Sequence, residues 1–128
     1  MGESYYAEAS LSGIRYSMDV KAFNQELFSA LSDIDFVEHI EIETEAIVVN
    51  GRAYIYGDMF LEIYFNEITG TIAFALIKAQ TRIWGIDKDA IRGWHEHPIH
   101  NPDSHVKIQQ KSIRKIIKKL EKVIKELE

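Results

Sequence analysis

The sequence predicts an α+β fold in which an antiparallel meander of five or six strands is flanked by an N-terminal and a C-terminal helix. Near both ends of the chain, apolar residues recur every three or four positions, which is the period of a helix. In the middle of the chain, apolar and polar residues alternate, and turn-like segments separate the alternating stretches. Turns this short cannot join parallel strands, because a parallel crossover needs about a dozen or more residues. At 128 residues and 46% hydrophobic content, the whole chain is predicted to form one domain with a substantial core.

The first helix is predicted to begin near Met18. Asp19 stands at its start, where a carboxylate favours the free amides of the first turn. The apolar positions of this helix share one face, and they are Val20, Phe23, Leu27, Leu31 and Ile34. Residues 1–16 show no clear hydrophobic period, so we expect them to be loosely ordered or to form a strand that is added to the sheet late.

After the first helix, apolar and polar residues alternate with a period of two, which is typical of strands. Asn50-Gly51 is predicted to be the turn of a hairpin, because both positions of a type I′ turn need positive φ. Residues 52–57 would then fold back on residues 45–49. The remaining segments are interpreted as a strand (58–65), a turn (66–70), two strands (71–79 and 81–86), a loop (87–93) and a last short strand (93–98).

The C-terminal segment is predicted to be an amphipathic helix that starts at Gln110 or Ser112. Its apolar stripe consists of Ile113, Ile116, Ile117, Leu120, Val123, Ile124 and Leu127. We expect this stripe to pack on the sheet. The same spacing also fits a short coiled-coil seam, so a homodimer through this helix is the alternative.

Charge is distributed unevenly along the chain. The net charge is −5, yet residues 107–128 hold eight basic side chains and only three acidic ones. A basic helix can contact RNA or a partner protein, and its candidate contact residues are Lys111, Arg114, Lys115, Lys118 and Lys122. A solvated helix face is an equal alternative, and the acidic body argues against tight nonspecific binding of nucleic acid.

The composition also restricts the class of protein. The chain has no cysteine, which excludes disulfides, thiolate metal sites and a cysteine nucleophile. No apolar run approaches the roughly 20 residues that span a bilayer, and the start of the chain lacks the features of a signal peptide. We therefore expect a cytoplasmic protein without membrane contact, and the abundance of isoleucine, lysine and glutamate resembles that of thermophile proteins.

Four of the five histidines and both prolines lie in the segment "GWHEHPIHNPDSHV" (93–106). Strand alternation puts His95 and His97 on one face, and a return fixed by Pro98 and Pro102 brings His105 toward them. These three histidines are the candidate catalytic residues. The supporting candidates are Trp94, Glu96, His100 and Asp103.

Three interpretations of this cluster are open. Two imidazoles can act as general base and general acid in phosphodiester cleavage without a metal, because their pKa is near neutral pH. Alternatively, His95, His97 and His105, with Asp103 or Glu96, can bind zinc or another divalent ion, although their spacing matches no specific zinc pattern. The third interpretation is a polar loop. Trp94 could stack on a base, but we favour an anchor in the core.

Residues 61–106 resemble the TumE-type family, the toxin half of toxin–antitoxin pairs. The resemblance extends over about residues 36–108 and rests on Trp84, Asp87, the pair His97-Pro98 and His105. It implies a toxin-like protein that acts beside a cognate antitoxin, and on RNA. Two hypotheses follow: a small histidine-dependent ribonuclease that uses the basic helix for phosphates, or a non-catalytic module that binds a metal or a partner protein.

Overall fold

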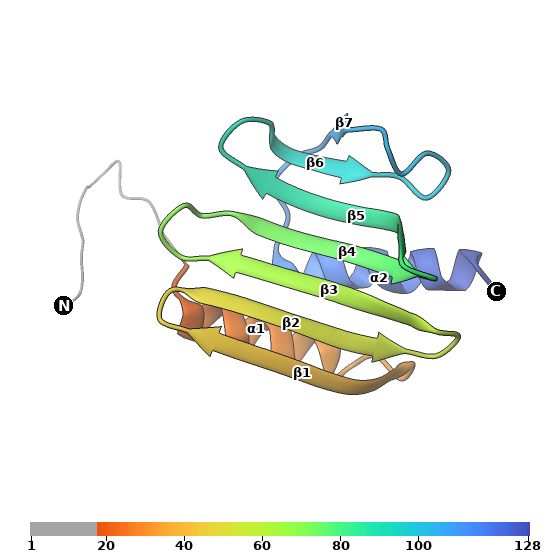
Figure 1. Ribbon diagram of the computed structural model, residues 1–128, viewed down its shortest axis with the longest axis horizontal. Coiled ribbons are helices and arrows are strands. Elements are labelled where there is room, and N and C mark those ends of the chain that lie inside the picture. The colour runs from red at the N-terminus through yellow and green to blue at the C-terminus, as the bar shows by residue number, and fades with distance from the viewer. Residues whose placement is uncertain (1–17) are drawn as a thin grey trace.

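The computed structural model describes residues 18–128, so the expectation for residues 1–16 lies outside the described part of the chain. Across these residues there are two helices and seven strands, and the strands form one antiparallel sheet in the order of the sequence (Figure 1). The elements are α1 (Val20–Leu31), β1 (Val37–Glu45), β2 (Val48–Ile55), β3 (Met59–Asn66), β4 (Ile72–Lys78), β5 (Thr81–Asp89), β6 (Gly93–His97), β7 (Val106–Lys107) and α2 (Ile113–Glu126). The predicted α+β meander is confirmed, with β7 as an additional strand of two residues.

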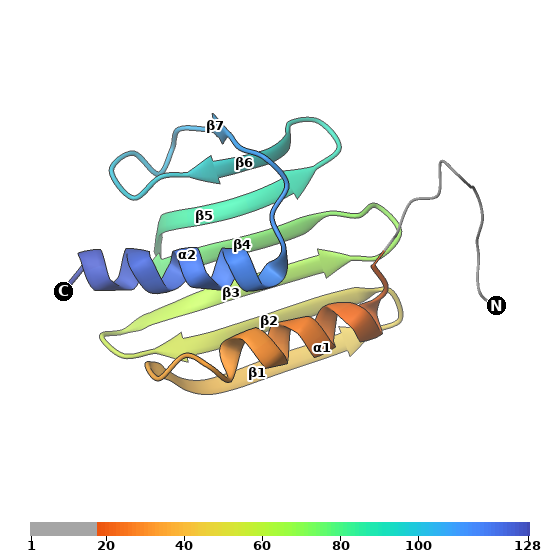
Figure 2. The ribbon, with the colours of Figure 1, turned by 180° about the vertical axis from the view of Figure 1, so that it is seen from behind.

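Both helices lie on the same face of the sheet (Figure 2). The start of α1 is capped by Asp19, whose Oδ1 accepts a hydrogen bond of 2.8 Å from the amide of Ala22. The start of α2 is capped by Ser112, whose hydroxyl accepts a hydrogen bond of 3.2 Å from the amide of Lys115. Each side-chain oxygen satisfies an amide that the helix itself leaves free. Neither of these two helices is long and apolar enough to cross a membrane.

The core lies between the helices and the sheet. The apolar stripe of α2 is buried there, as predicted, except for Leu127, which is 40% exposed. On the side of α1, the rings of Phe23 and Phe65 stack with their centroids 4.5 Å apart. Trp84 of β5 is fully buried under the helices. The opposite face of the sheet, which we call the open face, is covered by neither helix (Figures 1 and 2).

The hairpin predicted at Asn50-Gly51 is wrong. The turn between β1 and β2 consists of residues 46 and 47, and Ala46 adopts the positive φ of 53° there. Gly51 lies inside β2, where it pairs with Ile42 and Ile63. A Cβ at this position would clash with Cδ1 of Ile42. Glycine therefore allows the side chain of Ile42 to lie close to the backbone of β2, and it does not form a turn.

The loop predicted over residues 87–93 is also shorter than expected. Strand β5 continues to Asp89, and only three residues separate it from β6. Oδ1 of Asp89 accepts hydrogen bonds from the amides of Ile91 (2.9 Å) and Arg92 (2.7 Å). These bonds satisfy turn amides that have no partner on a neighbouring strand. As a consequence, Asp87 lies within the ladder, directly opposite His95.

Candidate functional site

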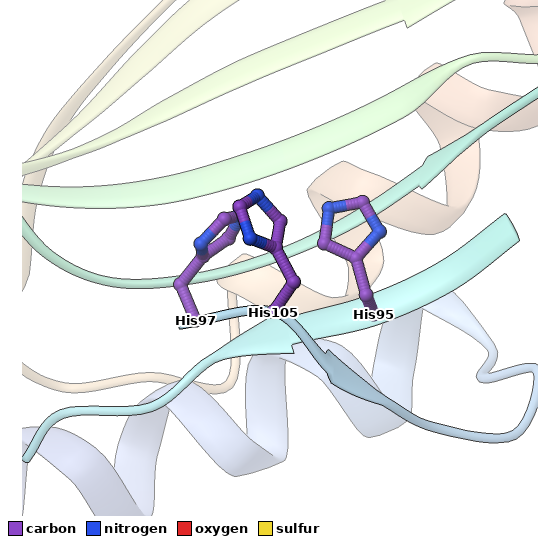
Figure 3. Close-up of side chains that lie close together, drawn as sticks. All are labelled: His95, His97 and His105. Atoms are coloured by element: carbon purple, nitrogen blue, oxygen red, sulfur yellow. The ribbon is translucent and has the colours of Figure 1, made fainter. Parts of the chain in front are cut away.

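The imidazole rings of His95, His97 and His105 meet on the open face of the sheet, beside β6. The ring centroids of His95 and His97 are 5.1 Å apart, and the ring of His105 lies 5.3 Å from the first and 4.7 Å from the second. One ring nitrogen of each residue lies within 4.8 Å of the other two, so this triad can hold a metal ion (Figure 3). The predicted convergence of the three histidines on one side is therefore confirmed.

The local sequence produces this convergence in two steps. Alternation along β6 puts His95 and His97 on the same side of the strand, where both are buried. Two successive turns then reverse the chain, closed by hydrogen bonds from the amide of Asn101 to the Pro98 carbonyl and from Ser104 to the Asn101 carbonyl, both 3.0 Å long. Because β7 pairs with β6 directly after this return, His105 comes to lie beside His97.

Asp87 is the fourth member of the site. Its Oδ2 lies 3.1 Å from Nε2 of His97 and 3.5 Å from Nε2 of His95. The spacing of residues in the sequence did not identify Asp87, because it lies on a different strand and in a segment interpreted as a loop. The signal that did point to it was the resemblance to the TumE-type family. Asp87 takes the place that Asp103 or Glu96 was expected to fill beside the imidazoles.

The hydrogen bonds of the two buried imidazoles place a proton on Nδ1 of each ring. Nδ1 of His95 lies 3.1 Å from the carbonyl oxygen of Gly93, and Nδ1 of His97 lies 3.0 Å from that of Pro102. A carbonyl oxygen only accepts, so each Nδ1 carries a proton. The carboxylate of Asp87 also only accepts, so Nε2 of His97 donates the hydrogen bond of 3.1 Å to it, and Nε2 of His95 faces the same oxygen at 3.5 Å. The negative charge of Asp87 thus faces both Nε2 atoms, and a positive charge is favoured there, either as a proton on a ring or as a metal ion that replaces it.

No family model, no curated protein and no solved structure matches this chain.

The third imidazole differs from the other two in its environment. His105 is exposed, whereas His95 and His97 retain 3% and 2% of their accessible surface. Partial desolvation, followed by the positive charge of Arg92, lowers the pKa of His105 below its ordinary value of 6.5. At neutral pH, His105 is thus in the neutral form that binds metals.

The supporting candidates do not join this cluster. Glu96 points to the face that carries the helices, where it accepts a hydrogen bond of 2.8 Å from Nε1 of Trp84. Trp94 packs against the core, which agrees with the anchor that we favoured. His100 and Asp103 are exposed on the loop between β6 and β7, and neither belongs to the group of ligand atoms that His95, His97 and His105 form.

The basic side chains of α2 and the imidazoles lie on opposite faces of the sheet. Nζ of Lys119 is 3.9 Å from Glu96 on the helix-bearing face, and Arg114 bonds to Asp33 at 2.9 Å beside α1. Of the other candidate contact residues, Lys115, Lys118 and Lys122 belong to α2, and Lys111 directly precedes its capping residue Ser112. Phosphates held by this helix would therefore not reach the histidines of the same molecule.

Proposed function

We propose that this protein is a metal-dependent hydrolase whose centre holds a divalent ion between His95, His97 and His105. The observation that carries the proposal is the arrangement of the two buried Nε2 atoms, which face one carboxylate oxygen while both Nδ1 protons are bound to backbone carbonyls. In metal sites, a ligating histidine almost always donates its second N–H to such a partner. The site therefore already has the hydrogen bonds that orient metal ligands.

Zinc is the ion that this set of ligands favours. Imidazole nitrogen is an ordinary zinc ligand, and three histidines leave one position for water or substrate. Zn–N bonds of about 2.0–2.1 Å place tetrahedral ligands roughly 3.3 Å apart. The ring nitrogens lie within 4.8 Å of one another, so loading requires a small inward movement, which the exposed His105 can make.

The expected reaction is hydrolysis of an ester, with a phosphate ester as the preferred class. A zinc ion held by His95, His97 and His105 would lower the pKa of its bound water to about 7 and would so supply the nucleophile. Asp87 supplies negative charge beside the two buried imidazoles and can accept a proton from that position. Arg92 and Arg82 contribute positive charge at His105, which favours a substrate whose reacting group is anionic.

The test is metal analysis together with an esterase assay on the full chain. We expect one zinc per chain and hydrolysis of a chromogenic phosphodiester that chelator abolishes and zinc restores. His97→Ala should lose both the zinc and at least 100-fold in rate, whereas His100→Ala, from the same loop, should keep both. A protein that binds no zinc, or an activity that survives chelator and His97→Ala, would overturn the proposal.

A toxin-type role is a second candidate, and it rests on the resemblance to the TumE-type family. The observation that favours it is that Asp87, His97 and His105, which are spread over 19 positions of the sequence and carry the resemblance, come together at one site. RNA would then be the phosphate ester, and an antitoxin would be the cognate partner.

The growth rate of a bacterial host that expresses the protein tests the toxin-type role. Induced expression should slow growth, His97→Ala should relieve the effect, and His100→Ala should not. Co-expression of the product of the adjacent gene should also relieve it if that product is the antitoxin. Normal growth with abundant wild-type protein would argue against the toxin role and leave the metal centre to be judged by zinc binding.

A further inference from the structure

Arg82 lies on the same face as the histidines because β5 is irregular. The register between β4 and β5 shifts, so that Leu76 pairs with Trp84 whereas Ile77 pairs with Arg82. In a regular strand Arg82 and Trp84 would share a face, and Trp84 is buried in the core. Ile77 alternates with the buried Leu76 and therefore lies on the open face, and its partner Arg82 lies there too. Bulges of this kind are common beside active sites, where they redirect a side chain.

Gly85 provides the path that the side chain of Arg82 follows. A Cβ on Gly85 would lie 2.8 Å from the carbonyl oxygen of Phe74 and 3.6 Å from Cδ of Arg82. The aliphatic part of Arg82 thus passes over a position that another residue's side chain would fill. In the ladder, Gly85 is directly opposite His97, so Arg82 lies beside a buried imidazole of the site.

Two further cations are near the imidazoles. Lys107 pairs with His95 in the short ladder between β6 and β7, which puts both side chains on the open face. Arg92 belongs to the turn before β6, and its charge, after desolvation, lowers the pKa of the exposed imidazole. Among residues 18–128, Asp87 is the only carboxylate that pairs with the histidines of the site. Positive charge is therefore in excess here, and a divalent ion would increase the excess.

Arg82 differs from two other arginines in having no counter-charge. Arg52 pairs with Glu62 and Arg114 pairs with Asp33, whereas no ion pair between residues 18 and 128 includes Arg82. Arg82 is also half-buried. A half-buried guanidinium beside a metal centre is unfavourable, since like charges repel more strongly where water is partly excluded. An anionic ligand relieves this repulsion, and a neutral ligand does not.

We propose that Arg82 selects phosphate esters at this site, because its guanidinium binds one non-bridging oxygen of the ester while the ion held by the imidazoles binds the other. The inference rests on the proposed function, and it adds the residue that makes the site specific for an anionic substrate. A guanidinium donates charge-assisted hydrogen bonds to phosphate oxygens and stabilises the charge that develops on them in the transition state. A carboxylic ester has one carbonyl oxygen, which the metal ion would take, so it leaves Arg82 without a partner.

Binding of inorganic phosphate to the full chain tests this inference apart from any reaction. By calorimetry at low ionic strength, zinc-loaded Arg82→Gln should bind phosphate about tenfold more weakly than the wild type. The variant should nevertheless bind zinc at least as tightly as the wild type, because a positive charge beside the ion has been removed. Arg82→Lys keeps the charge but lacks the planar fork, so its phosphate affinity should be intermediate. Arg52→Gln removes an arginine from the same face on β2 and should bind phosphate as the wild type does.

Hydrolysis rates give a second measure of selectivity. The substrates are a chromogenic phosphodiester and an uncharged chromogenic carboxylic ester. Arg82→Gln should change the ratio of their kcat/KM values by about 100-fold in favour of the uncharged ester, because it removes a group that touches only the phosphate. Arg52→Gln should leave the ratio unchanged.

Equal phosphate affinity in Arg82→Gln and the wild type, or an unchanged ratio of the two rates, would refute the inference. If Arg82→Gln does not fold, as judged by its melting temperature, Arg82→Lys decides by the same comparisons. A wild type that binds no zinc contradicts the metal centre, and phosphate binding to the metal-free chain then decides the role of Arg82. A loss in Arg82→Gln but not in Arg52→Gln supports an anion site at Arg82, and equal affinities contradict it.

Discussion

Asp87 and His95 face each other across the ladder between β5 and β6, and the carboxylate of Asp87 is shared between His95 and the next imidazole on the same side of β6, His97. The sharing is a consequence of register. Both histidines lie on one side of β6, and Asp87 stands opposite the first of them. A single carboxylate therefore faces both Nε2 atoms, and any ion held by the imidazoles lies beside it.

The first prediction concerns this carboxylate. Asp87→Ala should lower the affinity for zinc by about tenfold or more, because it removes the negative charge that faces the ligating Nε2 atoms. The fold should persist, because Asp87 is only partly buried, with 21% of its side chain exposed. Zinc affinity is measured by competition with a chelator of known strength. Asp103→Ala, which removes a carboxylate from the exposed loop, is the control and should bind zinc as the wild type does.

The second prediction concerns stability. A ligand that binds only the folded state adds about 2.7 kcal/mol at a concentration 100 times its dissociation constant. Zinc at that excess should thus raise the melting temperature by roughly 10 °C for a domain of this size. Chelator should reverse the shift. His105→Ala should reduce the shift strongly with little effect on the metal-free melting temperature, because His105 is exposed; an unchanged shift in this variant would remove His105 from the centre.

The parts of the fold that the sequence predicted correctly are those that local periodicity determines. The stripe of α2 and the pair His95 and His97 each follow from one element's own repeat, and Ser112 follows from capping chemistry. The turn at Asn50-Gly51 was wrong because its local signal competes with the pairing of three strands, and the pairing prevails.

The remaining features of the site depend on which strands become neighbours. Asp87 joins the histidines only when β5 and β6 are aligned, and nothing in its own sequence context fixes that alignment. The direction of Arg82 depends on a bulge, which shifts the alternation by one residue.

The third prediction tests the packing of α2. Ile117→Ala should lower the free energy of unfolding by about 2–5 kcal/mol, because Ile117 is 1% exposed and its truncation leaves a cavity under the helix. Denaturant unfolding measures this loss. Lys118→Ala, at the exposed neighbouring position, should change stability little. An equal effect of the two substitutions would mean that the stripe does not pack on the sheet in solution.

The fourth prediction concerns pH and the turn that aligns β5 with β6. The amide of Arg92 donates a hydrogen bond to the Asp89 carboxylate and, with that of Ile91, holds the pKa of Asp89 below its ordinary value of 3.8. A carboxyl group whose pKa is lower in the folded state stabilises the protein fully above the pKa of the unfolded chain. This contribution is lost as the pH falls through the pKa of the folded state.

Asp89→Asn keeps an oxygen acceptor but removes the charge that binds the two amides most strongly. The variant should therefore be less stable than the wild type at pH 7, and the difference should shrink as the pH falls below about 3.8. Urea unfolding of both proteins across this range measures the difference directly. If the difference stayed constant with pH, the ionised form of Asp89 would contribute nothing special to the turn. If it shrinks as expected, the turn that brings Asp87 opposite His95 depends on this charge.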